Sequence, residues 1–291
     1  MRKEPRGYRL RRGETVPDGV ARIARGRLDH ALDELRGVTD SSSEAAVHEA
    51  RKDMKKLRAL LRLARDELGD DVYRRENECF RDAARRLSGV RDADVMLATL
   101  DRLDGSFKEL RHSLKEHRRA HPDRGDGVVI AELQQARLRV DRWPLEHHGF
   151  EAIEGGLRRV YRRGRRAQDA VEAEPSTKTL HEWRKREKDL WYHLTLLRGA
   201  WPAPLEATAD EAHALSERLG DDHDLAVLHA WAHAQPDAGA LDRFDGAVER
   251  RRAELQADAL DLGRRLYAER PRAFAARLGG YWSAWHGHGT S

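Results

Sequence analysis

The chain of 291 residues has little of what disulfide-rich, membrane-spanning or sheet proteins require. Its one cysteine, Cys79, excludes a disulfide within the chain. No apolar run reaches the roughly 20 residues that cross a bilayer, and the first residues lack the apolar segment of a secretory signal. No alternating strand pattern occurs, and β-branched residues are sparse. We therefore expect a cytoplasmic protein with no membrane partner and no β-sheet.

What the chain has instead is charge and helix-forming residues. Charged residues make up 36% of the sequence and aromatic residues only 6%, and long stretches are rich in Ala, Leu, Arg and Glu. These are strong helix formers, so the composition predicts an all-α protein. The net charge is only +4, but the basic residues are clustered, and clustered positive charge indicates an anionic partner.

Apolar residues recur at helical spacing between Pro, Gly and Ser-rich breaks. In the first half we expect helices at about residues 18–37, 44–68, 70–87, 91–103, 106–120 and 127–142. In the second half we expect them at about 150–173, 177–199, 204–219, 222–234 and 238–269, followed by a short aromatic tail. Ser42 or Ser43 and Ser176 or Thr177 are the expected N-caps of the two histidine-bearing helices.

An internal repeat organises the chain. Residues 47–58 read Val-His-Glu-Ala-Arg-Lys-Asp-Met-Lys-Lys-Leu-Arg, and residues 180–191 read Leu-His-Glu-Trp-Arg-Lys-Arg-Glu-Lys-Asp-Leu-Trp. His48 thus corresponds to His181, 133 positions later, and Arg91-Asp92 to His223-Asp224, 132 positions later. We expect one domain over residues 1–291, with a first helical repeat at 15–145, a second at 150–270 and a C-terminal tail at 271–291.

The helices of both copies have a positive face opposite an apolar one. At 100° per residue, six basic residues lie within about 80° of His48, and the apolar residues lie on the other side. The second copy places three basic residues and Tyr192 beside His181, with Trp183 opposite. The helix before each copy is also basic. The basic residues are Arg51, Lys52, Lys55, Lys56, Arg58 and Arg62 in the first copy, Arg184, Lys185 and Lys188 in the second, and Arg22, Arg25, Arg158, Arg162 and Arg165 on the preceding helices.

Such a face is often only a solvated surface whose charges are balanced by nearby Asp and Glu. However, like charges at i,i+4 destabilise a helix by roughly 0.2–0.5 kcal/mol per pair. Such pairs include Arg51–Lys55, Lys52–Lys56, Arg58–Arg62, Arg158–Arg162, Arg159–Arg163 and Arg162–Arg166. The cost of these six, on the order of 1–3 kcal/mol, is noticeable beside a domain stability of about 5–15 kcal/mol. We therefore favour an anionic ligand. Neighbouring cations disfavour a metal at His48 and His181, so we expect no metal and no other cofactor, and a phosphate oxygen as the imidazole's partner.

The two His-x-x-Arg-Lys-x-x-Lys motifs, each in an amphipathic helix after a basic one, resemble the CHAD domain. The stretches Gly7-Tyr-Arg-Leu-Arg-Arg-Gly-Glu and Tyr161-Arg-Arg-Gly-Arg-Arg resemble it too. The resemblance implies two helical bundles related by a pseudo-twofold axis, with a basic central pore or groove. It implies non-catalytic binding of inorganic polyphosphate, recruitment to polyphosphate granules, and phosphate-polymer enzymes as partners. The binding residues it implies are His48, Arg51, Lys52, Lys55, Lys56, Arg22, Arg25, Arg158, Arg162, Arg165, His181, Arg184, Lys185 and Lys188. We add Arg62, which the helical spacing places on the same face as His48.

The second copy departs from the first in two places. It has Asp189 where the first has Lys56, and His223 where the first has Arg91. These exchanges predict that the second half holds phosphate less strongly along that edge. The tail Tyr281-Trp-Ser-Ala-Trp-His has no counterpart in the pattern, and we expect it to be a packing element.

Two other functions compete with polyphosphate binding. Nucleic acid shares the phosphate chemistry, but single-strand binders add aromatic stacking platforms, and most of the Trp residues here, Trp183 for example, map to apolar faces. A phosphohydrolase needs a P-loop or carboxylates that hold Mg²⁺, and no P-loop pattern occurs. The acidic clusters Asp92-x-Asp94 and Asp221-Asp222-x-Asp224 are interpreted as helix caps and salt bridges to arginines. We expect no enzyme activity, with nucleic acid or general polyanion binding as the alternative function.

Overall fold

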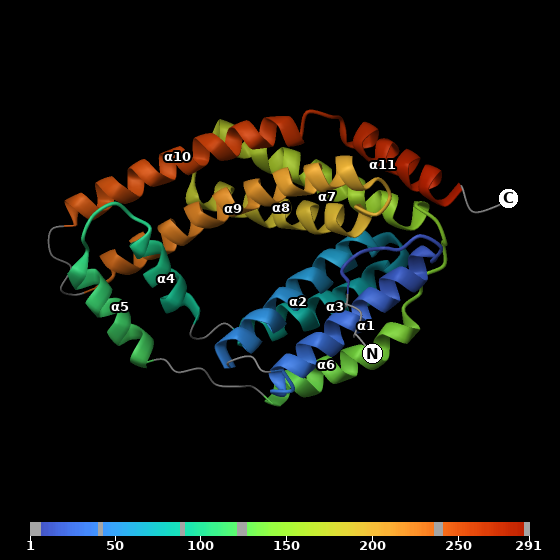
Figure 1. Ribbon diagram of the computed structural model, residues 1–291, viewed down its shortest axis with the longest axis horizontal. Coiled ribbons are helices and arrows are strands. Elements are labelled where there is room, and N and C mark those ends of the chain that lie inside the picture. Colours follow the sequence, from blue (N-terminus) through green and yellow to red (C-terminus); the bar gives the residue numbers. More distant parts are fainter. Residues whose placement is uncertain (1–6, 40–42, 88–90, 121–126, 236–240, 288–291) are drawn as a thin grey trace.

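A computed structural model describes residues 7–39, 43–87, 91–120, 127–235 and 241–287, where eleven α-helices and one short 3-10 helix are found and no strand (Figure 1). The all-α expectation is confirmed. The first-half helices are α1 (Val16–Leu35), α2 (Ser43–Leu63), α3 (Arg65–Arg86), α4 (Arg91–Asp101), α5 (Lys108–Ala120), α6 (Gly127–Arg139) and η1 (Val140–Arg142). The others are α7 (Glu151–Ala173), α8 (Thr177–Leu197), α9 (Pro202–His233), α10 (Asp242–Leu266) and α11 (Pro271–His286).

The helices form two groups that do not follow the division of the sequence. Helices α1, α2, α3 and α6 make one bundle, and α7 to α11 make the other (Figure 1). Helices α4 and α5 belong to the first half of the chain but pack at the far end of α9 and α10. A small apolar core there joins Met96, Leu100 and Leu114 to Leu228 and Phe244. The first half therefore contributes α4 to the surroundings of α9.

Local signals explain where several helices begin. The Thr15 hydroxyl accepts a hydrogen bond from the Asp18 backbone N–H at 3.2 Å, and Pro17 follows in the first turn of α1. Ser176 forms a capping box with Thr179 at the start of α8, so the expected cap is confirmed there. The expected cap of α2 falls on Ser42, which lies outside the described residues, or on Ser43, whose side chain does too.

Two expectations about helices were wrong. Residues 202–233 form one helix, not two, because Gly220 continues α9 and the buried Asp222 accepts hydrogen bonds from Arg252 (2.9 Å) and Gln256 (2.7 Å) of α10. The aromatic tail is a 16-residue helix, α11, which buries Phe274 and packs against α7. Its packing role agrees with the expectation, but Gly279 and Gly280 hid its helical pattern in the sequence.

The two bundles meet where α2 packs against α7 and α8. Gly156 of α7 lies against the carbonyl groups at the end of α2. The Arg62 guanidinium donates to Asp189 of α8 at 3.0 Å, and the His193 ring of α8 lies 2.8 Å from the Ala59 carbonyl oxygen. These contacts hold α2 and α8, the two motif-bearing helices, against each other.

The first three helices of each half pack in the same order: α1 contacts α2 and α2 contacts α3, just as α7 contacts α8 and α8 contacts α9. The pseudo-twofold superposition of residues 15–145 on 150–270 stays a prediction. Within the described ranges, no helix combines the length and apolarity needed to cross a membrane.

Candidate functional site

A cleft of about 390 Å³ lies where α2, α4, α8 and α9 meet. Its cations come from the matched positions of the two sequence motifs. Arg51 and Lys55 stand one helical turn apart on α2, as do Arg184 and Lys188 on α8, so each pair projects from one face of its helix. The residues that line the cleft are Arg51, Lys55, Val95, Met96, Arg184, Lys188, His223, Asp224 and Val227.

Burial of the opposite helix faces fixes the direction of these cations. Met54 on α2 and Trp183 on α8 each have none of their surface exposed and belong to the main core. The basic residues lie roughly 60–140° around their helices from these two apolar positions, so burial of Met54 and Trp183 in the core turns the basic faces toward the cleft.

The two arginines of the cleft have buried donor atoms without acceptors. Nε and Nη1 of Arg51 and Nε of Arg184 are buried, and none has a hydrogen-bond partner in the described part of the chain. Burial lowers the pKa of the Arg184 guanidinium, while Asp224 acts in the opposite direction. A buried donor without an acceptor costs about 1–3 kcal/mol, and more when it is charged. Acceptor atoms of a ligand would remove that cost.

Two histidines lie side by side at the edge of the cleft. The rings of His181 and His223 have centroids 4.5 Å apart. Burial, with Arg184 and His181 adding to it, lowers the pKa of His223 to about 4. Burial, with Lys185 and Arg184, also lowers the pKa of His181. Nδ1 of each ring is buried without a hydrogen-bond partner among the residues that the structure describes, so both rings can still bind an oxygen atom.

Asp224 is the one carboxylate among the residues lining this cleft. Burial raises its pKa, and Arg184 opposes that shift. The other acidic residues of the two clusters pair with arginines: Asp94 with Arg118 at 2.9 Å, Asp221 with Arg102 at 3.0 Å, and Asp222 with Arg252 at 2.9 Å. The salt-bridge interpretation is confirmed for these three, and the side chain of Asp92 lies outside the described residues.

Four predicted site residues on α2 do not line the cleft, and three of them, His48, Lys52 and Lys56, lie in its first four turns. Lys52 pairs with Glu49 at 2.9 Å, and Nε2 of His48 lies 3.9 Å from the same carboxylate. The Lys56 ammonium lies 5.9 Å from the centre of the Tyr8 ring, and burial lowers its pKa. The solvated-face alternative therefore describes Lys52 better than a ligand contact does.

Further predicted residues are paired with carboxylates elsewhere. Arg25 on α1 and Arg62 at the end of α2 bind acidic residues far away in the sequence, Arg22 binds one eight positions before it, and Lys185 binds the carboxylate one turn before it. The pairs are Arg22 with Glu14 (2.5 Å), Arg25 with Asp141 (2.6 Å), Arg62 with Asp189 (3.0 Å) and Lys185 with Glu182.

The basic face of α7 is also absent from the cleft. Arg158, Arg162 and Arg165 do not line it, and Arg165 donates to the Glu269 carbonyl oxygen at 3.2 Å. Tyr192, expected beside the basic face, is 5% exposed and packs edge-on against Tyr8 at 5.8 Å.

Sequence reasoning did not assign His223, Asp224 or the apolar wall of Val95, Met96 and Val227 to the site. A signal for the first two was present, because the repeat matched Arg91-Asp92 with His223-Asp224. The apolar wall depends on α4 packing beside α9, which no local pattern specifies.

Known proteins resemble this arrangement in sequence and fold. The crystal structure of the CHAD domain from the plant Ricinus communis matches with a TM-score of 0.66 and 18% identity. The match covers 89% of this chain and 94% of that one, which shows a common fold. No curated protein matches the chain. The family model of the CHAD domain matches residues 22–233, most of the chain. The protein belongs to the CHAD domain family.

Proposed function

We propose that this protein binds inorganic polyphosphate, without altering it, in the cleft between α2 and α8. The observation that carries the proposal is the pair of arginines, one from each half, with buried and unpartnered guanidinium nitrogens in one cleft. Phosphate oxygens are strong acceptors, and guanidinium groups donate to them in a charge-assisted geometry. A linear polymer with a charge on each unit can contact both helices at once.

The walls of the cleft favour polyphosphate over nucleic acid. Single-stranded nucleic acids are usually held by aromatic side chains that stack on the bases. None of the nine lining residues is Phe, Tyr or Trp, and the apolar positions are Val95, Met96 and Val227. Phosphate recognition needs donors and charge alone, so this lining suits a polymer without bases. Nucleic acid, or polyanions in general, remains the alternative function.

The arrangement of carboxylates favours binding over hydrolysis. Metal-assisted phosphoryl transfer uses two or more carboxylates to hold ions beside the phosphate. Asp224 stands in the cleft beside Arg184, while Asp221 and Asp222 of the same helix are engaged by arginines. We therefore propose a role as a binding module in the cytoplasm. There it would bring itself, or phosphate-polymer enzymes attached to it, to polyphosphate granules.

The test compares long-chain polyphosphate with single-stranded DNA of equal charge, over a range of salt concentrations. Arg51→Gln/Arg184→Gln removes both cleft guanidinium groups, and Arg74→Gln/Arg85→Gln removes two exposed ones of α3 as the matched control. The log–log salt slope of polyphosphate binding should fall by about 0.7 per lost contact, hence by about 1.4 in the cleft variant. The control should bind like the wild type.

Four outcomes would overturn parts of the proposal. If the folded cleft variant binds polyphosphate as tightly as the wild type, the site is wrong. Equal losses in the cleft variant and the control would indicate general attraction by net charge. Equal affinity of the wild type for DNA would make the protein a general polyanion binder, and release of orthophosphate from polyphosphate in the presence of Mg²⁺ would make it an enzyme. Far-UV circular dichroism verifies that each variant is folded.

A further inference from the structure

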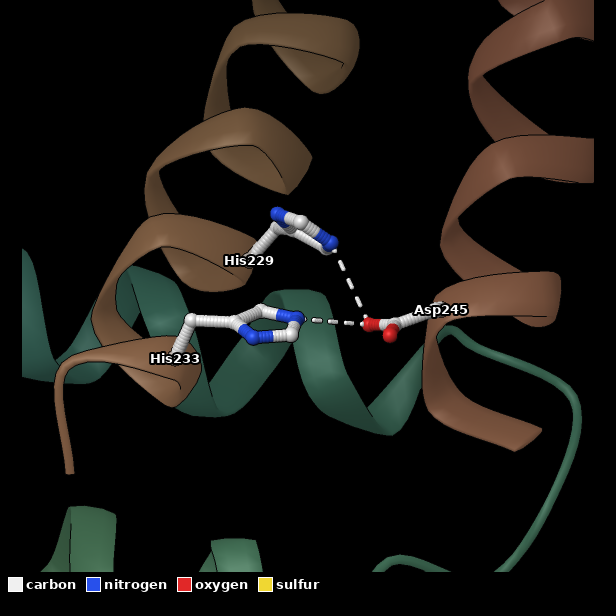
Figure 2. Close-up of side chains that lie close together, drawn as sticks. All are labelled: His229, His233 and Asp245. Carbon is white, nitrogen blue, oxygen red and sulfur yellow. Dashed lines mark hydrogen bonds and ion pairs between the residues drawn. The ribbon is translucent and has the colours of Figure 1, made fainter. Parts of the chain in front are cut away.

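A second cluster of histidines lies away from the cleft, near the ends of two helices. His229 and His233 stand one turn apart at the end of α9, and Asp245 faces them from the first turns of α10 (Figure 2). Nε2 of His229 lies 3.2 Å from Oδ1 of Asp245, and Nε2 of His233 lies 2.9 Å from the same oxygen. We propose that these three side chains form a binding site for a divalent transition-metal ion of the zinc class.

The geometry suits such an ion. Zinc binds imidazole nitrogen and carboxylate oxygen at about 2.0–2.2 Å, which places neighbouring ligands of a tetrahedron about 3.3–3.5 Å apart. The distances from Asp245 Oδ1 to the two Nε2 atoms, 3.2 Å and 2.9 Å, are close to this ligand–ligand distance. One ligand atom from each of the three residues lies within 4.8 Å of the other two. Small rotations of the side chains would therefore admit an ion between them.

The helices hold the three ligands in place before an ion arrives. The i,i+4 spacing puts both imidazoles on one side of α9, as in helical zinc motifs with two histidines. The His229 ring also stacks against Phe244 at a centroid distance of 6.1 Å and an interplanar angle of 13°. Both helices are anchored by the apolar core that contains Leu228 and Phe244. Ion binding would therefore require little ordering of the backbone.

The chemistry of the donors selects the kind of ion. Two imidazoles and one carboxylate suit zinc, nickel, cobalt or copper, whereas magnesium and calcium prefer oxygen ligands alone. The protons now shared with Asp245 can leave Nε2 or move to Nδ1, since neutral imidazole has two tautomers. The side chains are 39%, 45% and 28% exposed, so water can fill the remaining position.

The local charge distinguishes this cluster from His48 and His181. Those residues have arginine and lysine three and four positions later, which disfavours a cation. No lysine or arginine occurs on α9 after Arg218. An ion bound here would connect the end of α9 to the start of α10.

The experiment titrates the untagged full-length protein with Zn²⁺ by calorimetry and with Co²⁺ by visible absorption, without polyphosphate because it chelates divalent ions. The wild type should bind one equivalent and give cobalt d–d bands typical of a site with nitrogen and oxygen ligands. His233→Ala and Asp245→Asn should each weaken binding by at least about tenfold, by analogy with the losses seen at metal sites. His213→Ala, on the same helix and 40% exposed, is the matched control and should bind normally.

Two results would overturn the site. One is wild-type binding no tighter than that of His233→Ala, and the other is an equal loss in His213→Ala, which would indicate scattered surface histidines. Asp245→Asn keeps the size of the side chain, so a normal thermal melt of this variant separates loss of the ion from loss of the fold.

Discussion

A methyl group at Gly156 would test the contact that holds α7 against α2. A Cβ atom there would lie nearest to the carbonyl oxygen of Leu63, 2.7 Å from the carbonyl carbon of Leu63 and 2.8 Å from the carbonyl oxygen of Arg62. Carbon atoms normally pack at about 3.5–4.0 Å, so the helices would have to separate by roughly 1 Å. The obstacle is backbone, which cannot rotate away as a flexible side chain would.

The expected cost follows from two opposing effects. Overpacking a tight contact destabilises a protein by about 1–3 kcal/mol, occasionally more. Replacing Gly by Ala inside a helix returns about 0.5–1 kcal/mol. A backbone obstacle places the steric cost at or above the upper end of that range, so we expect Gly156→Ala to lose about 2 kcal/mol or more in total.

Urea unfolding measures this loss. Gly280→Ala on α11 is the matched control, since a Cβ there meets nothing within 4 Å and should stabilise the protein by about 0.5–1 kcal/mol. If Gly156→Ala is as stable as the wild type, the close approach of α7 to α2 is wrong. The placement of α2 beside α8 would then lose one of its supports.

Two further predictions concern the cleft and the bundle interface. Polyphosphate affinity should rise as the pH falls from 7.5 toward 5. His223, with a pKa of about 4 in the free protein, is neutral there, and bound phosphates raise that pKa, so binding takes up a proton. Uptake of one proton raises the affinity for polyphosphate by at most about tenfold per pH unit. His223→Gln should make the affinity less dependent on pH. If this variant shows the same pH dependence as the wild type, the role of His223 is wrong. Arg62→Met leaves Asp189 buried without its 3.0 Å partner, and urea unfolding should show a loss of about 3–5 kcal/mol. Arg62→Met/Asp189→Leu should recover most of it, and no recovery would contradict the ion pair.

The sequence was sufficient to predict on which helix face some of the cationic side chains lie. Arg51 and Lys55 share a helix face, as do Arg184 and Lys188, and the apolar residues opposite them are buried, so helical periodicity alone indicates where they point. The helical fold was predictable for the same reason: strong helix formers and apolar spacing agree along most of the chain. Errors arose at Gly220 and in α11, where glycines interrupt the pattern and tertiary packing restores the helix.

Pairing of the other cations could not be predicted, because it depends on residues distant in the sequence. Arg25 binds Asp141 and Arg159 binds Asp66, and neither acid shares a helix with its partner. A helical wheel places an arginine on a face but contains no information about the neighbouring helix. His223 joins the site through the packing of α9 against α8, and the repeat, which matches it with Arg91, was the one signal for it in the sequence.

The exchange of Lys56 for Asp189 between the two copies serves the bundle interface. From the sequence it predicts a weaker phosphate edge, yet neither residue lines the cleft, and Asp189 is 6% exposed and paired with Arg62. The position that matches Arg62 in the second copy is Thr195, whose hydroxyl donates to the Trp191 carbonyl oxygen at 2.9 Å. If both copies formed this ion pair, the position of Lys56 would have to hold an acid and the position of Thr195 a base. They do not, so the pair of Arg62 with Asp189 has no counterpart between Lys56 and Thr195. The cations repeated in both copies at the cleft are Arg51 with Arg184 and Lys55 with Lys188. The residues that hold the bundles together thus differ between the copies, while the proposed ligand, which would contact both helices, would account for the matched cations.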